Sequence, residues 1–168
     1  LNNTKNTQPA IYTVSAMVKA VLNENGLQAA AAAGHSLGEY SALHAAGVLS
    51  FADGLKLVRR RGELMDQADP DGKGTMAAVI GLADEEVEAV LEEIDGIVTV
   101  ANYNSPGQVV ISGEVEAVGA AEKELSEKGA KRVIPLTVSG AFHSPLMEPA
   151  REELKSTIEA VDFNDAKI

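Results

Sequence analysis

Gly34-His35-Ser36-Leu37-Gly38 has the G-x-S-x-G pattern of a nucleophile elbow, a tight turn between a strand and a helix. Glycine is expected on both sides of the serine because a side chain there would collide with the strand or the helix. The turn exposes the serine hydroxyl at a helix N-terminus, where the helix dipole and the Leu37 amide can stabilise an oxyanion. The pattern also occurs by chance, so its context has to support it. In the right context it predicts an α/β fold with Ser36 as a nucleophile.

The residues around this pentapeptide supply the expected context. Leu27 to Ala33 precede it, and although five consecutive alanines favour a helix by propensity, the elbow requires a strand there. A helix is predicted from about Leu37 to Ala46, with a stop at Gly47. Upstream, Pro9 suits a first helical position, and an apolar stripe at helical spacing predicts a helix that ends at Gly26. That stripe consists of Ile11, Val14, Val18, Val21 and Leu22.

The composition excludes several classes of protein. The 168 residues include 25 Asp and Glu against 14 Lys and Arg, a formal net charge of -11. Phosphate binding needs a basic surface, so neither nucleic acid nor an anionic membrane is expected as a partner. There is no run of about 18 apolar residues, which argues against a membrane-spanning segment. With no Cys and three His, disulfides and thiolate sites are excluded and no metal site is expected. Such a chain is expected in the cytoplasm.

A different pattern begins after the turn-rich segment 69–74. Strand and helix periodicities follow in the order βαββαβ, which is that of a ferredoxin-like unit. The expected strands are 76–80, 97–101, 108–111 and 132–138. Ser144-Pro145 is typical of a helix start and opens a last helix. We therefore expect an α/β-hydrolase-like large subdomain at residues 1–73 and 138–168, with a ferredoxin-like small subdomain inserted at residues 74–137.

A serine nucleophile needs a base, and three histidines are available. His35 is next to Ser36 and points elsewhere, and His44, two helical turns after Ser36, is expected to be structural. His143 ends a strand and directly precedes a helix, which is where sites assemble in α/β folds. The nearby helix N-terminus disfavours an imidazolium, so His143 is expected to be neutral and able to accept a proton. A capping or packing histidine is the alternative.

Three consecutive arginines, 59–61, lie on a helix that Ser50 and Asp53 are expected to begin. Successive helix positions point about 100° apart, so at least one arginine faces inward. Arg61 is followed by Gly62, which is expected to leave open space beside it. An inward arginine with such space can hold a carboxylate through two hydrogen bonds. A solvated basic face paired with Asp or Glu is the alternative.

Residues 102–108, with the sequence NYNSPGQ, are predicted to join two strands of the insert as a hairpin loop. Their Asn and Gln side chains can line a cleft toward the elbow. Because these residue types dominate turns in general, a plain structural turn is the favoured interpretation.

Four segments taken together resemble one family. GHSLGEYSAL at 34–43, RGELM at 61–65, NYNSPGQVVISG at 102–113 and AFHSPLM at 141–147 occur in this order. They are similar to segments of the malonyl-CoA:acyl carrier protein transacylase family and of the related acyltransferase domains of polyketide synthases. The similarity extends over essentially the whole chain. It implies an α/β-hydrolase-like large subdomain that carries a ferredoxin-like small one, in agreement with the order above.

The resemblance also implies roles for individual residues. Ser36 attacks the thioester of malonyl-CoA with His143 as base, and the phosphopantetheine thiol of acyl carrier protein then collects the malonyl group. The Leu37 amide matches one oxyanion donor, and Arg61 matches the arginine that pairs with the free malonyl carboxylate. Residues matched to the substrate cleft are Met65, Asn104 and Phe142, the last in the malonyl-selective pattern. No cofactor is implied, because the two thioesters are substrates, and the chain is expected to be a monomer.

Members of this family are nearly twice as long, so the sequence is expected to be the central portion of a transacylase. The family's Gly-Gln-Gly segment, whose Gln supplies the other oxyanion contact, has no counterpart in it. Three alternatives stay open: a serine esterase or thioesterase, a non-catalytic fragment of the transacylase, and service to polyketide rather than fatty-acid synthesis. An esterase usually places an acid between Ser and His in chain order, and Asp53 and Asp66 are available for that.

Overall fold

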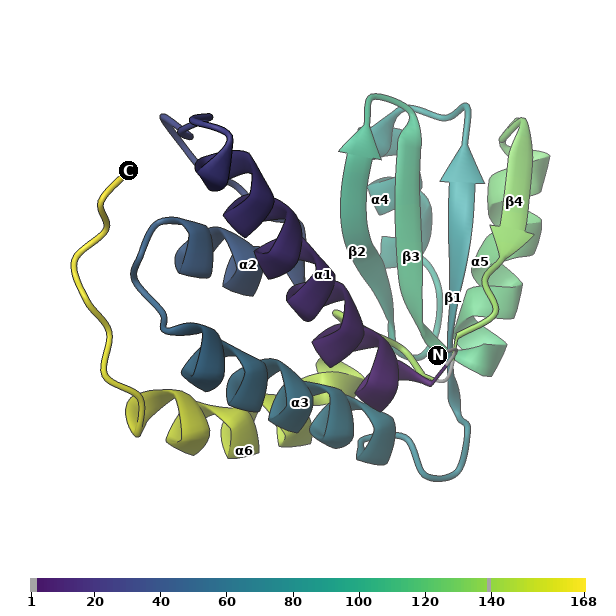
Figure 1. Ribbon diagram of the computed structural model, residues 1–168. Coiled ribbons are helices and arrows are strands. Elements are labelled where there is room, and N and C mark those ends of the chain that lie inside the picture. Colours follow the sequence, from purple (N-terminus) through teal and green to yellow (C-terminus); the bar gives the residue numbers. More distant parts are fainter. Residues whose placement is uncertain (1–2, 139) are drawn as a thin grey trace. The chain divides into compact units, whose positions relative to one another are not determined.

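The computed structural model describes residues 3–138 and 140–168, which divide into two compact units (Figure 1). The first unit runs to Leu64 and resumes at Glu152, and the second comprises Met65–Arg151. The first unit contains α1 (Thr4–Glu24), α2 (Gly38–Ala45), most of α3 (Phe51–Gln67) and most of α6 (Glu148–Glu159). The second unit carries the sheet.

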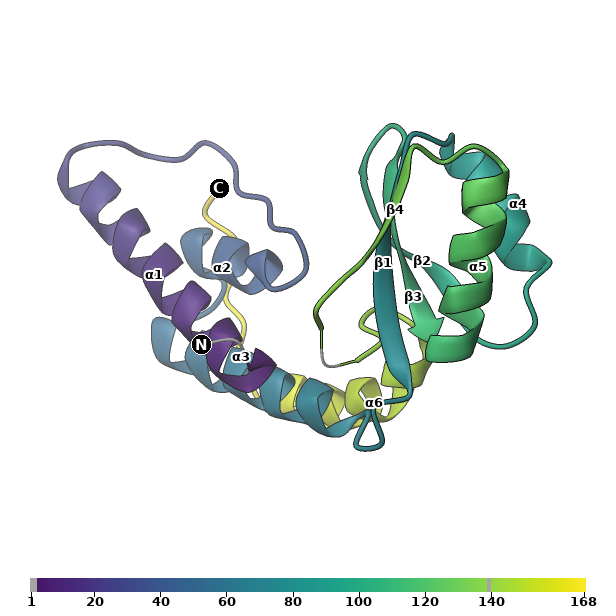
Figure 2. The same ribbon diagram turned by 90° about the vertical axis from the view of Figure 1, so that its right-hand side faces the viewer.

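The second unit is built on a four-stranded antiparallel sheet. Its strands are β1 (Gly74–Ile80), β2 (Val98–Ser105), β3 (Gln108–Glu114) and β4 (Arg132–Pro135), in the spatial order β2-β3-β1-β4. The connecting helices α4 (Asp84–Glu92) and α5 (Val115–Glu127) lie against the same face of the sheet (Figure 2). The predicted element order βαββαβ is confirmed.

The core of the second unit follows from the two periodicities of strand and helix. In β1 and β3, alternate residues such as Val79, Val109 and Ile111 point to the helices and are at most 1% exposed. The helices contribute Val87, Val90, Leu91, Val118, Ala121 and Leu125 to the same cluster. Burying each large aliphatic side chain stabilises the fold by about 1.5–3 kcal/mol, so this layer holds sheet and helices together.

Tyr12 is at the centre of the first unit's core. Its side chain is fully buried, and its ring stacks on Phe51 with centroids 5.6 Å apart and lies 5.9 Å from the His44 ring. Gly54 makes room for it, since a Cβ there would lie 2.0 Å from the Tyr12 hydroxyl oxygen. His44 Nδ1 lies 3.1 Å from the Leu49 carbonyl oxygen. The structural role predicted for His44 is therefore confirmed.

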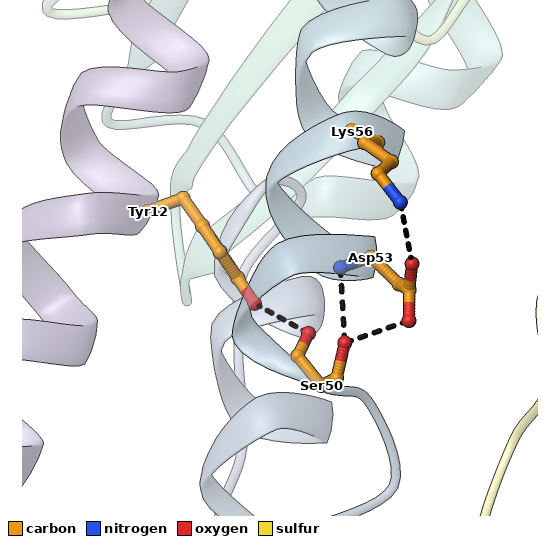
Figure 3. A network of polar contacts seen from close by, with 4 residues as sticks. All are labelled: Tyr12, Ser50, Asp53 and Lys56. Atoms are coloured by element: carbon orange, nitrogen blue, oxygen red, sulfur yellow. Dashed lines mark hydrogen bonds and ion pairs between the residues drawn. The ribbon is translucent and has the colours of Figure 1, made fainter.

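Ser50 caps the N-terminus of α3 (Figure 3). The Asp53 N–H donates to Ser50 Oγ at 3.0 Å, and the Ser50 hydroxyl donates to the Asp53 carboxylate at 2.7 Å. Lys56 donates to the same carboxylate at 3.0 Å, and the Tyr12 hydroxyl lies 3.5 Å from the Ser50 carbonyl oxygen. The hydrogen bonds from Ser50 and Lys56 lower the pKa of Asp53. The predicted start of this helix is confirmed.

The alanine run before the elbow is not a strand. Residues 27–34 have neither helix nor strand structure and are exposed, and all of the described strands belong to the sheet of the second unit. A strand is defined by its ladder with a neighbour, and the described part of the chain supplies no neighbour for this segment. The predicted strand is wrong for this structure, whereas the helix after the elbow, α2, is confirmed.

α1 begins earlier than the sequence indicates. Its N-cap is Asn3, whose side chain accepts from the Lys5 N–H at 3.1 Å, so Pro9 lies inside the helix rather than at its first position. An Asn cap stabilises a helix start, and this cap determines where α1 begins. The predicted stop is confirmed, since Gly26 has a φ of 78°. The predicted apolar stripe is 44–58% exposed within this structure.

Two other boundaries differ from the prediction. β2 continues to Ser105 and β3 starts at Gln108, so the hairpin turn consists only of Pro106 and Gly107. Asn104 therefore belongs to a strand and not to a loop. Cross-strand pairing of Tyr103 with Val109 extends the ladder past the turn-forming residue types that predicted a longer loop. β4 ends at Pro135, three residues earlier than expected.

Candidate active site

Ser36 lies on a strained turn directly before α2. Its φ is 51°, in the left-handed region, which costs a residue with a Cβ about 1–2 kcal/mol. The Gly38 N–H donates to the His35 carbonyl at 2.9 Å and the Glu39 N–H donates to the Ser36 carbonyl at 3.1 Å, which closes the turn. Backbone strain of this kind concentrates at functional sites. The backbone at Ser36 thus has the conformation that a nucleophile elbow requires.

Position 34 requires glycine because backbone atoms of the same turn lie very close to it. A Cβ at position 34 would lie 1.9 Å from the Gly38 carbonyl carbon and 2.2 Å from the Glu39 nitrogen. A Cβ at Gly38 would meet nothing within 4 Å. The predicted steric need for glycine is therefore confirmed at Gly34 and is wrong at Gly38 within the described residues.

Replacing Gly34 with alanine is expected to destabilise the protein by about 1–3 kcal/mol or to rearrange the elbow, because the new methyl group overlaps backbone atoms. The free energy of unfolding in urea measures the effect. Gly38→Ala is the matched control and is expected to change that free energy by less than about 1 kcal/mol. Equal losses for the two variants would contradict the steric explanation.

Arg61 is the arginine that turns inward. Its Nη2 donates to Ser36 Oγ at 3.0 Å and its Nη1 donates to Gln8 Oε1 at 2.7 Å. The Tyr40 ring centroid lies 5.9 Å from Arg61 Cζ, within the range of a cation–π interaction. No carboxylate in residues 3–138 or 140–168 forms an ion pair with Arg61. The predicted inward orientation is confirmed.

Burial and the neighbouring side chains shift the pKa of Arg61 in opposite directions. Burial lowers the pKa of Arg61, while Tyr40 and Glu39 oppose this shift. Burial also raises the pKa of Tyr40, so its phenol stays neutral near pH 7. An arginine remains charged throughout the range in which proteins fold. Arg61 is thus a half-buried cation that donates its hydrogen bonds to uncharged groups, an amide and a hydroxyl.

The other two arginines form surface pairs. Arg59 Nε donates to Glu63 Oε1 at 3.1 Å, and Arg60 Nη2 donates to Glu153 Oε2 at 2.9 Å. Exposed pairs of this kind contribute about 0–1 kcal/mol. The alternative interpretation of the basic run, a solvated face paired with acids, therefore describes Arg59 and Arg60.

Gly62 provides close packing rather than open space. It is buried, and a Cβ there would lie 2.9 Å from Lys5 Cα and 3.1 Å from the Thr4 carbonyl oxygen. The predicted space beside Arg61 is therefore wrong at this position. The glycine instead lets the beginning of α1 approach α3.

Leu37 is the N-cap residue of α2 and is half-buried. The Tyr40 N–H donates to its carbonyl oxygen at 3.1 Å, and the hydrogen bonds that close the turn begin with the Gly38 N–H. Among the described residues, the hydrogen bonds that close the turn do not use the Leu37 N–H, which is next to Ser36 at the start of a helix. The oxyanion role of Leu37 stays a prediction that this geometry permits.

His143 lies on another left-handed corner, in the second unit. Its φ is 61° and its side chain is exposed. Ser144 fixes the corner, because its hydroxyl donates to the Ala141 carbonyl at 2.7 Å and accepts from the Leu146 N–H at 3.2 Å. Ser144 caps the short helical turn before α6, as predicted. The role of His143 as a base stays a prediction.

The other predicted site residues have different degrees of exposure. Met65 is half-buried near the end of α3, Phe142 is half-buried next to His143, and Asn104 is exposed on β2. Ser36, Leu37 and Arg61 belong to the first unit, and Met65, Asn104, Phe142 and His143 belong to the second. Within the first unit, a hydrogen bond joins Arg61 to Ser36.

Gln8 and Tyr40 contact Arg61 and were not among the predicted site residues. Tyr40 belongs to the segment GHSLGEYSAL, so its place next to the elbow was a usable signal. Gln8 is 53 residues from Arg61 and belongs to none of the four motifs. Nothing local in the sequence indicates its contact.

Within residues 3–138 and 140–168, no group of His, Asp and Glu is arranged to hold a metal ion. None of the helices found there combines the length and the apolar character needed to cross a membrane.

Comparison with known proteins places the whole chain in one family. The acyl transferase domain family matches residues 1–168. The chain is 48% identical over 171 residues to the malonyl CoA-acyl carrier protein transacylase of Bacillus subtilis (strain 168), with 100% of this chain and 54% of that protein covered. It is 46% identical over 170 residues to the transacylase of the same name from Staphylococcus aureus (strain MRSA252), with 99% and 54% covered. The chain thus spans about half the length of the curated relatives it matches.

Solved structures show the same similarity. An acyl carrier protein S-malonyltransferase from Vibrio cholerae superposes with a TM-score of 0.96 at 47% identity, covering 100% of this chain and 56% of that one. A type II polyketide acyl-carrier protein in complex with its malonyl-transacylase gives a TM-score of 0.97 at 44% identity, covering 100% and 55%. With its fold, its elbow serine and its full-length match, the chain belongs to the acyl transferase domain family.

Proposed function

We propose that this chain takes part in malonyl transfer from malonyl-CoA to the phosphopantetheine thiol of acyl carrier protein, through an ester on Ser36. The observation that carries the proposal is Arg61, a half-buried cation without an acidic partner in the described chain that contacts the elbow hydroxyl directly. A simple esterase has no use for such a group. Relatives named for malonyl transfer support the same reaction.

The chemistry of the malonyl group fits this pair of residues. One methylene group separates its free carboxylate from the thioester carbonyl. A short diacid of this kind can place its carboxylate on a guanidinium and its carbonyl carbon beside the neighbouring hydroxyl. In the structure, Ser36 Oγ is 3.0 Å from Arg61 Nη2. Two charge-assisted hydrogen bonds from arginine would orient the carboxylate.

The proposed reaction has two half-reactions. In the first, Ser36 Oγ attacks the thioester carbonyl carbon, the hydroxyl proton passes to His143, and the Leu37 N–H donates to the oxyanion. The C–S bond then breaks, and the CoA thiolate leaves with the proton from His143. In the second, the thiol of the carrier protein gives its proton to His143 and attacks the serine ester, and Ser36 regains its proton as it leaves.

We further propose roles for the other residues of the site and a setting for the reaction. Met65, Asn104 and Phe142 would line the substrate cleft, and no cofactor or metal would be needed. The chain would act as a monomer in the cytoplasm, for fatty-acid or polyketide synthesis. One relative's structure is a complex with a polyketide acyl-carrier protein, which supports a carrier protein as the acceptor.

The same proposal covers the subdomains. Residues 74–137 would be a ferredoxin-like small subdomain, inserted in an α/β-hydrolase-like large subdomain at 1–73 and 138–168. The support is the element order βαββαβ with both helices on one face of an antiparallel sheet.

The intact mass after a short incubation with malonyl-CoA tests the function. One malonyl adduct is expected, and it should disappear when acyl carrier protein with a free phosphopantetheine thiol is added. Loss of the adduct at the same rate without carrier protein would indicate a thioesterase. A folded chain that leaves malonyl-CoA unspent and acquires no adduct would be a non-catalytic fragment.

A further inference from the structure

We infer that Gln8 is a positioning residue that makes the site selective for acyl groups bearing a carboxylate, because it holds Arg61 through an uncharged oxygen. The inference rests on the proposed roles of Arg61 and Ser36 and adds a residue that none of the four motifs contains.

Gln8 is one of the few polar side chains buried in the described chain. It is 5% exposed, and its Oε1 accepts from Arg61 Nη1 at 2.7 Å. The other terminal nitrogen, Nη2, donates to Ser36 Oγ at 3.0 Å. A planar guanidinium with one terminal nitrogen held in this way has its second terminal nitrogen fixed in direction. Gln8 therefore determines where Arg61 points relative to the nucleophile.

The packing of α1 on α3 explains how Gln8 reaches Arg61. Lys5 lies against Gly62, where an added Cβ would be 2.9 Å from Lys5 Cα. Gln8 follows Lys5 by three residues, so it occupies the same face of α1 one turn later. A long amide side chain at that position meets the guanidinium of the residue that precedes Gly62. The close contact between Lys5 and Gly62 and the hydrogen bond between Gln8 and Arg61 thus both result from the packing of α1 on α3.

The selectivity depends on the neutrality of the Gln8 side chain as well as on its length. A glutamate has nearly the same shape but would form a charge-assisted pair with Arg61, about twice as strong as a hydrogen bond between uncharged groups. The positive charge of Arg61 would then be compensated inside the protein, and an incoming carboxylate would meet a like charge. The Tyr40 ring beside Arg61 is uncharged too, and Glu39 acts on Arg61 without forming an ion pair. Without a direct ion pair in the described chain, the Arg61 cation is available to a substrate carboxylate.

The test compares Gln8→Glu, Gln8→Met and the unmodified chain, with Gln28→Glu as a control that adds the same charge in an exposed loop. Binding of free malonate is followed by calorimetry, and acylation of Ser36 by malonyl-CoA and by acetyl-CoA is followed by intact mass. We expect Gln8→Glu to weaken malonate binding and to slow malonyl transfer at least tenfold, with acetyl transfer changed less than threefold. Gln8→Met removes the hydrogen bond without adding charge and should lower the malonyl-to-acetyl ratio severalfold. Gln28→Glu should match the unmodified chain.

Other results would contradict either the proposed role of Arg61 or the inferred role of Gln8. If the unmodified chain neither binds malonate nor forms a malonyl ester, the proposed role of Arg61 fails, and the inference about Gln8 fails with it. If the unmodified chain does both and Gln8→Glu does both equally well, only the inference about Gln8 fails. A merely structural role would slow malonyl and acetyl transfer equally in both variants and would also overturn it. Should Gln8→Glu not fold, the acyl ratio of Gln8→Met decides.

Discussion

Replacing Ser36 with alanine is expected to leave no malonyl ester after incubation with malonyl-CoA and to reduce transfer to acyl carrier protein by about 10⁴–10⁶-fold. Removing the nucleophile of a comparable serine site costs about that much, because the covalent route is lost and only binding and oxyanion stabilisation persist. The fold should survive, since alanine meets the same backbone constraint at a φ of 51° as serine does. Intact mass and the rate of malonyl-carrier formation are the two measurements.

Ser41→Ala is the matched control for this variant. Ser41 is also on α2, and within the described part of the chain its buried Oγ has no hydrogen-bond partner. Removing an unsatisfied buried hydroxyl is expected to be neutral or stabilising. Transfer by Ser41→Ala should therefore stay within about twofold of the unmodified chain. A malonyl adduct that persists on Ser36→Ala would show that another residue is the nucleophile.

Replacing Arg61 with alanine is expected to reduce malonyl transfer by about 10²–10³-fold. Two charge-assisted hydrogen bonds to a carboxylate contribute about 3–4 kcal/mol together, and that free energy corresponds to this loss. Acetyl transfer should change far less, because an acetyl group has no carboxylate to bind. The measurement is the ratio of the two acylation rates of Ser36, followed by intact mass.

Two further variants separate the effect of the Arg61 charge from that of its planar shape and from that of a surface arginine. Arg61→Lys keeps the charge but lacks the planar fork, so its malonyl transfer is expected to lie between those of alanine and arginine. Arg59→Ala removes an exposed arginine of the same helix, paired with Glu63, and should leave both rates nearly unchanged. Equal losses of malonyl and acetyl transfer in Arg61→Ala would show that the arginine supports the fold of the site rather than the carboxylate.

Local signals in the sequence predicted most of the fold correctly. The βαββαβ order, the Ser50 cap and the helix stops at Gly26 and Gly47 each depend on residues close in the chain, and the structure contains all of them. The strand predicted at the alanine run was wrong because a strand depends on a partner strand. The pattern within one segment does not reveal that partner. The predicted hairpin loop was too long because Asn and Ser favour turns, whereas cross-strand pairing keeps Asn104 in β2.

The candidate site was predictable only in part for the same reason. The elbow motif identified Ser36, and the helical geometry of three consecutive arginines required one to face inward. Which arginine does so, and what it contacts, depends on the packing of α1 against α3. Gln8 reaches Arg61 across that packing, and the spacing of 53 residues has no periodicity from which to infer it.

The left-handed backbone at Ser36 and His143 has a consequence for redesign of this protein. Among the described residues other than glycine, only these two have a positive φ. Glycine adopts such a conformation without the steric penalty of a Cβ. A design procedure that scored conformational stability alone would therefore favour glycine at both corners and would delete the hydroxyl and the imidazole together. At these two positions the residue that suits the backbone best is the one that cannot perform the chemistry.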